Sequence, residues 1–169
     1  MGESVNQLVK SQPQGLSSIQ ELVKEDLDLV ATELHRIVVS DFELIDQVNE
    51  HLFLTRGKLF RPTLVLLSSR VGGEASDEAL TLAAVVELVH LATLVHDDAV
   101  DHSVLRRGLP TVNASWTHQV AIIMGDYLYS RGVTELAKLG NLPALEVLAQ
   151  AANEMAVGEM RQLMSYDAL

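Results

Sequence analysis

The sequence predicts an all-α fold, a bundle of long helices packed on one another. Of its 169 residues, 48% are hydrophobic and only 4% are aromatic, and the apolar residues are mostly Leu, Val and Ala. These residue types, spread over long segments at helical spacing, favour helix-on-helix packing over a sandwich of sheets. The chain has no Cys, which excludes disulfides, thiolate metal sites and a Cys nucleophile.

The first 16 residues differ from the rest of the chain. Residues 1–16 show no periodicity, so we expect a flexible amino-terminal arm followed by a helical domain over residues 17–169. Ser18, followed three residues later by Glu21, matches a capping box at a helix start. Apolar residues then recur at helical spacing as far as Ile37, which predicts a first long helix.

Two more helices are predicted before the glycine pair at residues 72–73. Asp41 is a favourable N-cap, and the helix that follows it ends before Gly57. The next helix spans residues 58–71. It has Pro62 close to its start, where a missing N–H costs little, and the glycine pair at its end.

The fourth predicted helix runs from about Glu78 to Asp101 and is apolar on nearly all sides. Such a helix is expected at the centre of a bundle. Its longest apolar stretch, residues 80–95, is interrupted by Glu87 and His90 and is shorter than a membrane span requires. We therefore expect no membrane span.

The rest of the chain predicts one loop and two further helices. Residues 106–111 contain Gly and Pro and are expected to form a loop. A helix is predicted over residues 118–139, with Gly140 as its stop. Pro143 opens a last helix that is still running at Met164.

The charge distribution points to a small anionic ligand. A net charge of -11 argues against nucleic-acid binding, which rests on basic surfaces. Five of the 12 basic residues nevertheless fall in two short stretches: Arg56, Lys58 and Arg61, then Arg106 and Arg107.

Residues 1–14 lack the apolar segment of a signal peptide, so we expect a cytoplasmic protein.

Three aspartates close the central helix and form a candidate metal site. Helical spacing sets Asp97, Asp98 and Asp101 within one turn, where their like charges oppose one another's ionisation. A divalent cation would relieve this repulsion, and Mg²⁺ commonly bridges carboxylates to substrate phosphates. The alternative is a solvated helix end that happens to be acidic.

The basic stretches offer partners for a phosphate group. Lys58 and Arg61 lie at a predicted helix start, where cations are poorly placed unless an anion is present. Arg106 and Arg107, in a predicted loop, are also expected to bind a phosphate group. His90 shares the helix face of the aspartates, although a lone His in an apolar helix also fits a hydrogen-bonded core residue.

Four motifs together resemble one enzyme family, the trans-type polyprenyl diphosphate synthases. The resemblance covers about residues 53–169 and implies the amino-terminal part of the isoprenoid synthase fold. The motifs occur in the family's order: Gly57-Lys58-x-x-Arg61-Pro62, Glu87-Leu88-Val89-His90, Asp97-Asp98-x-x-Asp101 with Arg106-Arg107-Gly108, and Gly125-Asp126-Tyr127-Leu128. A fifth match is Gly158-Glu159-x-x-Gln162-Leu163.

The resemblance implies a prenyltransferase that joins isopentenyl diphosphate to an allylic diphosphate with Mg²⁺ as cofactor. It assigns Mg²⁺ and the allylic diphosphate to the three aspartates, and the allylic diphosphate also to Arg106. It assigns isopentenyl diphosphate to four residues: Lys58, Arg61, His90 and Arg107. Family members carry a second aspartate-rich motif on a later helix. We therefore expect this chain to match the amino-terminal half only, and its activity alone stays open.

Product length is expected to depend on the central helix. A hydrocarbon tail that starts at the aspartates would pass Thr93, Ala92 and Val89, and none of these side chains is bulky enough to block it. The sequence therefore predicts a medium- or long-chain product. The alternative is ordinary small-residue packing between crossing helices.

Other interpretations remain at this point. If the chain keeps the fold but does not turn over substrate, it would serve as a non-catalytic or regulatory subunit of a heteromeric synthase. If it is an active enzyme, we expect a homodimer or a heteromer. His96-Asp97 is also similar to the metal-binding pair of phosphohydrolases, but His102 and His118 give no persuasive ligand set. A terpene cyclase would not explain the stretch around Lys58.

Overall fold

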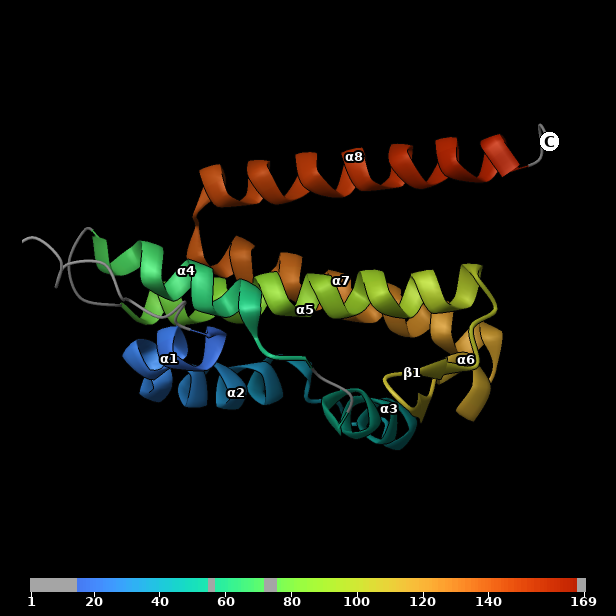
Figure 1. Cartoon of the computed structure of the whole chain (residues 1–169), viewed down its shortest axis with the longest axis horizontal. Coiled ribbons are helices and arrows are strands. Elements are labelled where there is room, and N and C mark those ends of the chain that lie inside the picture. The colour runs from blue at the N-terminus through green and yellow to red at the C-terminus, as the bar shows by residue number, and fades with distance from the viewer. Residues whose placement is uncertain (1–14, 55–56, 72–75, 167–169) are drawn as a thin grey trace, which may run out of the picture. The chain divides into compact units, whose positions relative to one another are not determined.

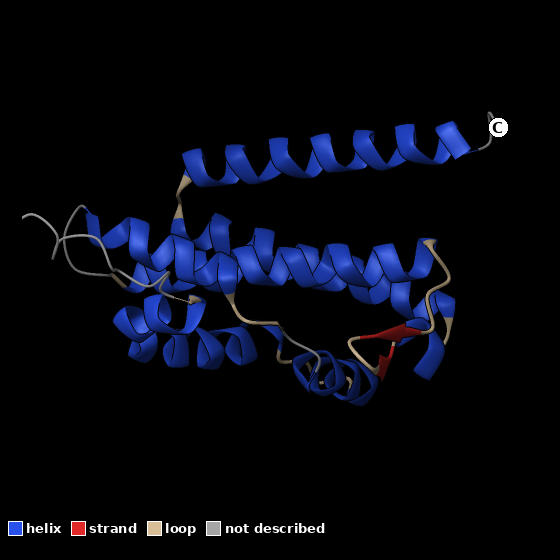
Figure 2. Cartoon of the chain, viewed as in Figure 1, coloured by secondary structure: helices blue, strands red, loops and turns tan. Residues whose placement is uncertain are grey.

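The computed structural model describes residues 15–54, 57–71 and 76–166, and these residues are almost entirely helical. Figure 2 shows helices together with one short two-stranded hairpin, which confirms the predicted all-α class. The predicted amino-terminal arm lies, for residues 1–14, outside the described residues. The chain divides into two compact units, residues 1–87 and 88–169, and each is described by itself.

The elements follow one another as labelled in Figure 1. They are α1 (Leu16–Gln20), the 3-10 helix η1 (Glu21–Val23), α2 (Lys24–Val38), α3 (Glu43–Leu54), α4 (Phe60–Val71), α5 (Asp77–Val100), β1 (Leu105–Arg106), β2 (Leu109–Pro110), α6 (Val112–Ser115), α7 (His118–Leu139) and α8 (Leu142–Tyr166).

The start of the first helix differs from the prediction. Gly15 is the N-cap of α1, and the Ser18 hydroxyl donates to the Gly15 carbonyl at 2.8 Å. Ser18 therefore lies inside the helix, and Glu21 begins the 3-10 helix instead of closing a capping box. The predicted box was wrong because the Ser hydroxyl bonds a backbone carbonyl one turn back, the local competition typical of Ser.

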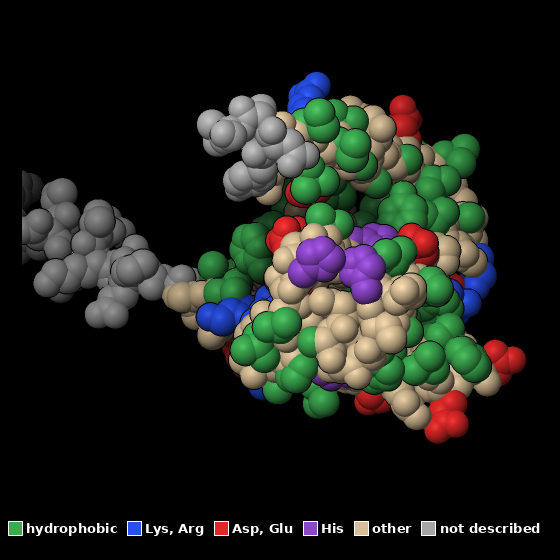
Figure 3. All heavy atoms as spheres, turned by 90° about the vertical axis from the view of Figure 1, so that its right-hand side faces the viewer, with side chains coloured by type: hydrophobic (Ala, Val, Ile, Leu, Met, Phe, Trp, Pro, Cys, Tyr) green, Lys and Arg blue, Asp and Glu red, His purple; other side chains and the backbone are tan. Residues whose placement is uncertain are grey.

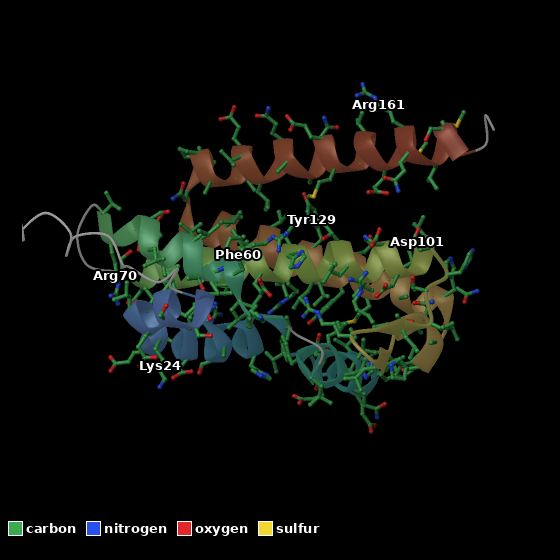
Figure 4. All side chains as sticks on the ribbon, in the orientation of Figure 1. Lys24, Phe60, Arg70, Asp101, Tyr129 and Arg161 are labelled. Atoms are coloured by element: carbon green, nitrogen blue, oxygen red, sulfur yellow. The ribbon has the colours of Figure 1, made fainter. Side chains whose placement is uncertain are left out.

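In the first unit, the apolar stripe of α2 forms a core. Val30, Leu34 and Ile37 recur at three- and four-residue spacing and are at most 1% exposed. Arg70 of α4, labelled in Figure 4, donates to the Leu22 carbonyl at 2.6 Å. The same guanidinium donates to the Asp26 carboxylate at 2.7 Å, which joins the end of α4 to the start of α2.

In the second unit, α7 is buried along one face and α8 is exposed along most of its length. Met124 and Leu128 of α7 are at most 3% exposed. Figure 3 shows one face of the whole chain, on which hydrophobic side chains (green) reach the surface beside acidic (red) and basic (blue) ones. The large exposed apolar residues of α8 are Leu142, Val147, Met155, Val157, Met160, Leu163 and Met164.

Helix α5 is the one described helix that is long and apolar enough to cross a membrane by length and composition. Of its most apolar window, 56% is buried inside the protein. The central helix of a globular protein passes the same test, so this property is weak evidence for a span.

Gly140 ends α7, as predicted, and provides a stability test. Its φ of 68° is left-handed, a conformation that penalises any Cβ. We expect Gly140→Ala to lower the free energy of unfolding by about 1 kcal/mol. Gly140→Asn should lose less, because Asn tolerates this region. Urea denaturation followed by circular dichroism measures both, and equal stability of Gly140→Ala and the wild type would contradict the assignment.

Candidate metal and diphosphate site

The predicted aspartates lie at the carboxyl end of α5, and they do not all face the same way. The Asp101 amide donates to the Asp97 carbonyl at 2.9 Å, so the helical pattern continues one residue beyond Val100. Asp97 and Asp101, four residues apart, lie on one face. The Asp97 side chain is 45% exposed and Asp101 is exposed, whereas the Asp98 side chain is only 9% exposed. Asp101 is labelled at this end of α5 in Figure 4.

Asp98 is engaged by an arginine. The Nε of Arg106 donates to Asp98 Oδ2 at 2.8 Å, and its Nη2 donates to Asp97 Oδ2 at 3.3 Å. The hydrogen bond that Arg106 donates to Asp98 raises the pKa of the guanidinium above its ordinary value, although partial burial opposes the shift. One guanidinium thus contacts two of the three carboxylates and neutralises part of their charge.

A small hairpin places Arg106. Strand β1 pairs antiparallel with β2, with Arg106 opposite Leu109. The two residues at the turn, Arg107 and Gly108, have φ of 53° and 82°, as required in the two-residue turns of type I′ hairpins. The sequence predicted only a loop here, since strands of two residues are too short to show an alternating pattern.

The hairpin is attached to the end of α5 by its own polar groups. The Ser103 amide donates to the Asp98 carbonyl at 2.9 Å. The Ser103 carbonyl accepts hydrogen bonds from the Thr111 hydroxyl at 2.7 Å and from the Asn113 amide at 2.9 Å. These bonds hold both ends of the hairpin beside Asp98.

The other α5 residues of the predicted site lie toward the start of the helix. His90 is half-buried, two turns before Asp97, and its carbonyl accepts the Thr93 hydroxyl at 2.7 Å. Val89 and Ala92 are 5% and 2% exposed, and Thr93 is half-buried. The chain-length role of these three residues stays a prediction.

Lys58 and Arg61 belong to the first unit. Lys58 is exposed and precedes α4 instead of opening it, since α4 begins at Phe60. The expected helix start at Lys58 was therefore wrong. Leu59 has a φ of 49°, which is outside the helical region and delays the helix. Arg61 is exposed in the first turn, and Arg56 lies outside the described residues.

Two of the carboxylates could hold a magnesium ion whose remaining ligands come from a phosphate group and water. Among the described residues, no group of three or more His, Asp or Glu side chains is arranged to hold a metal ion. Mg²⁺ is commonly held by one or two carboxylates, with phosphates and waters completing its shell. Asp97 and Asp101 supply such a pair of oxygen donors.

One contact that the sequence did not predict lies directly beside this site. His96 Nε2 is 3.0 Å from the Ile122 carbonyl oxygen and 3.4 Å from Asp126 Oδ1, both on α7. The signal was present in the Gly125-Asp126 motif, to which no role was given. The phosphohydrolase alternative gains no support, because the described residues hold no three-ligand group around His96 or around the His102 and His118 rings.

Comparisons with known proteins identify the family. The polyprenyl synthetase family matches residues 42–168. Octaprenyl diphosphate synthase of Escherichia coli is 37% identical over 150 residues, covering 89% of this chain and 46% of that protein. Heptaprenyl diphosphate synthase component 2 of Geobacillus stearothermophilus is 38% identical over 148 residues, covering 88% of this chain and 46% of that protein.

A solved relative adds structural agreement. The polyprenyl synthase of Caulobacter crescentus, complexed with calcium and isoprenyl diphosphate, superposes with a TM-score of 0.84 at 35% identity. The match covers 89% of this chain and 46% of that one, so the chain spans about half the length of the relatives it matches. Because the family match includes well over half of its residues, this chain belongs to the polyprenyl synthetase family.

Proposed function

We propose that this chain forms the amino-terminal part of a prenyltransferase. The reaction condenses isopentenyl diphosphate with an allylic diphosphate to a medium- or long-chain trans-polyprenyl diphosphate. The observation that carries the proposal is the pair of outward carboxylates at the end of α5 with Arg106 beside them. The octaprenyl and heptaprenyl synthases among the relatives support it. A cytoplasmic location is part of the proposal.

The carboxylates would hold Mg²⁺ against the allylic diphosphate. Asp97 and Asp101 would supply the metal ligands. When bound, Mg²⁺ supplies the Lewis acidity that neutralises the departing diphosphate. The Caulobacter relative is complexed with calcium and isoprenyl diphosphate, which supports a divalent cation and a diphosphate as ligands. Asp98, the third aspartate of the predicted metal site, would act on the same ligand by orienting Arg106.

Basic side chains would bind the two diphosphates. Arg106, held at its Nε by Asp98, would direct its remaining donors to the allylic diphosphate. The resemblance assigns isopentenyl diphosphate to the other basic residues, and we carry that assignment over as a proposal. These residues are Lys58, Arg61, His90 and Arg107.

Cleavage of the C–O bond of the allylic diphosphate would give an allylic cation and free diphosphate. The apolar face of α5 would exclude water from this cation, so that the double bond of isopentenyl diphosphate is the nearest nucleophile and forms the new C–C bond. Transfer of a proton from the adduct to the released diphosphate would then restore a double bond. Val89, Ala92 and Thr93 would line the path of the growing chain.

The product-length assignment can be tested in a chimera that joins residues 1–169 to the second half of E. coli octaprenyl diphosphate synthase. We expect Ala92→Phe and Thr93→Phe to shorten the product, because an aromatic ring would block the tail, and chromatography of the products measures this. Thr93 is half-buried and serves as the safer variant, since Ala92 is 2% exposed. Folded variants with unchanged product length would contradict the assignment.

The activity itself is tested by incubating the chain with Mg²⁺, labelled isopentenyl diphosphate and an allylic starter. Prenyl products that require Mg²⁺ would support the proposal for the chain alone. An absence of product from the chain alone and from the chimera would overturn it. Omitting the starter is the control for background signal.

A second candidate function is a subunit of a heteromeric synthase. The exposed apolar residues of α8 favour it, since such surfaces mark association sites. The heptaprenyl synthase relative named as a component also supports it. This candidate predicts diphosphate binding without turnover, and light scattering on the purified chain would separate a monomer from a homodimer.

A further inference from the structure

The Gly125-Asp126 motif of α7 lies against His96 of α5. The imidazole Nε2 lies 3.0 Å from the Ile122 carbonyl oxygen. A carbonyl only accepts hydrogen bonds, so Nε2 carries the hydrogen and donates it. The Asp126 carboxylate, at 3.4 Å, lies beside the same nitrogen. Residues 122–126 thus present two oxygens to one nitrogen of His96.

The glycine of this motif leaves the space in which the His96 ring lies. A Cβ built on Gly125 would overlap the ring, and its three nearest heavy atoms would be Nε2, Cδ2 and Cε1 of His96. Gly125 is buried in the middle of a helix, where Gly is less favourable than Ala. The close approach of the ring therefore gives a physical reason for Gly at this position.

The position of His96 gives this contact a consequence for the site. His96 directly precedes Asp97, and Cα atoms of neighbouring residues are about 3.8 Å apart in a rigid backbone. A ring held in place at His96 therefore fixes the rotation of the last turn of α5. That turn carries Asp97 and Asp101, whose carboxylates the proposed function assigns to the metal.

We propose that His96 is a positioning residue that joins the carboxylate end of α5 to α7, with Gly125 as the seat of its ring and the Ile122 carbonyl as its acceptor. The proposal rests on the proposed function, because it assumes that Asp97 and Asp101 bind a metal–diphosphate complex. It gives the Gly-Asp motif a role: the glycine accepts the ring and the aspartate lies beside its N–H. In this role His96 would act through the backbone of Asp97 and not by contact with the metal or the diphosphate.

The contact between the His96 ring and Gly125 is tested by thermal unfolding of the whole chain. Gly125→Ala should lower the Tm by on the order of 5 °C, because the added methyl overlaps the ring. In the background of His96→Ala the same substitution should not lower the Tm, since the ring is gone. Gly158→Ala is the matched control. It adds the same methyl to α8 where nothing lies within 4 Å, and should raise the Tm.

The positioning role is tested by titrating the chain with Mn²⁺ and inorganic pyrophosphate and measuring the binding by calorimetry. His96→Ala should weaken binding roughly 10-fold, the size of effect seen when a supporting partner of a metal ligand is lost. His96→Gln, whose amide nitrogen can donate to the same carbonyl, should recover most of the affinity. A purely structural role would lower the Tm without changing this affinity.

The outcomes separate the two proposals. Wild-type chain that fails to bind Mn²⁺ with pyrophosphate overturns the proposed function for this chain, and the positioning role with it. Wild-type chain that binds, with folded His96→Ala binding equally well, overturns the positioning role alone. If the Tm changes of Gly125→Ala and His96→Ala simply add in the double variant, the proposed contact between the His96 ring and Gly125 is overturned.

Discussion

Asp97→Asn should reduce the affinity of the chain for Mn²⁺ with pyrophosphate by on the order of 100-fold or more. Loss of a supporting residue around a metal ligand already costs about 10- to 100-fold, and Asp97 is a proposed ligand itself. The substitution removes the charge but keeps the size of the side chain. Mn²⁺ serves as the probe because it prefers the same oxygen donors as Mg²⁺. Calorimetric titration measures the change.

Two further variants provide a second test of the metal ligands and a control for the loss of charge. Asp101→Asn should behave like Asp97→Asn, because the two carboxylates share a helix face. Asp28→Asn removes the same charge from an exposed position on α2 and should bind like the wild type. Binding that survives in Asp97→Asn, or falls equally in Asp28→Asn, would sink the assignment of the metal ligands.

Arg106→Ala should lower the free energy of unfolding by about 3 kcal/mol, because it leaves the buried Asp98 carboxylate without its cation. Asp98→Ala should cost less, about 1–2 kcal/mol, because Arg106 can then turn toward water. The exposed fractions of the two side chains, 9% for Asp98 and 30% for Arg106, set this order. Urea denaturation of both variants measures it.

The pair of Arg36 and Glu33, in which both side chains are less buried than Asp98, is the control. Their side chains are 51% and 19% exposed and 2.7 Å apart, and surface pairs contribute about 1 kcal/mol or less. Arg36→Ala should therefore cost less than Arg106→Ala. Equal losses in Arg36→Ala and Arg106→Ala, or a larger loss in Asp98→Ala than in Arg106→Ala, would contradict the argument.

The contribution of the Arg106–Asp98 pair to stability should not change between neutral and mildly alkaline pH. Hydrogen bonding to Asp98 raises the folded-state pKa of Arg106 above its unfolded value. Its contribution to stability is then complete below the unfolded-state pKa and is lost only as pH rises through the folded-state pKa, far above neutrality. A cost of Arg106→Ala that shrinks between neutral and mildly alkaline pH would contradict this sign.

The helices were predictable where local chemistry decides their ends. Helix α7 spans the predicted residues 118–139. The Thr117 hydroxyl accepts from the Val120 amide at 3.1 Å, and left-handed Gly140 stops the helix at its other end. Two other signals failed for local reasons. Ser18 bonds a backbone carbonyl, and Leu59 adopts a positive φ that delays α4.

The sequence predicted which acidic residues form the site, but not which way their side chains point. Spacing in the sequence places Asp97, Asp98 and Asp101 within one turn, yet nothing in that spacing says which carboxylate is covered. The hairpin brings Arg106 back over the helix end, where it bonds Asp98. The His96 contact was equally hidden, because its acceptor lies 26 residues away on α7.

The sequence by itself determined the helical class, the family resemblance and the identity of the acidic and basic residues, because periodicity, caps and motif spacing are local properties. Tertiary structure alone decided that Asp98 turns inward to Arg106 while Asp97 and Asp101 face outward, and that His96 lies against Gly125. Burial and close approach depend on which neighbour covers a side chain. That neighbour comes from a distant segment, which spacing along one helix does not encode.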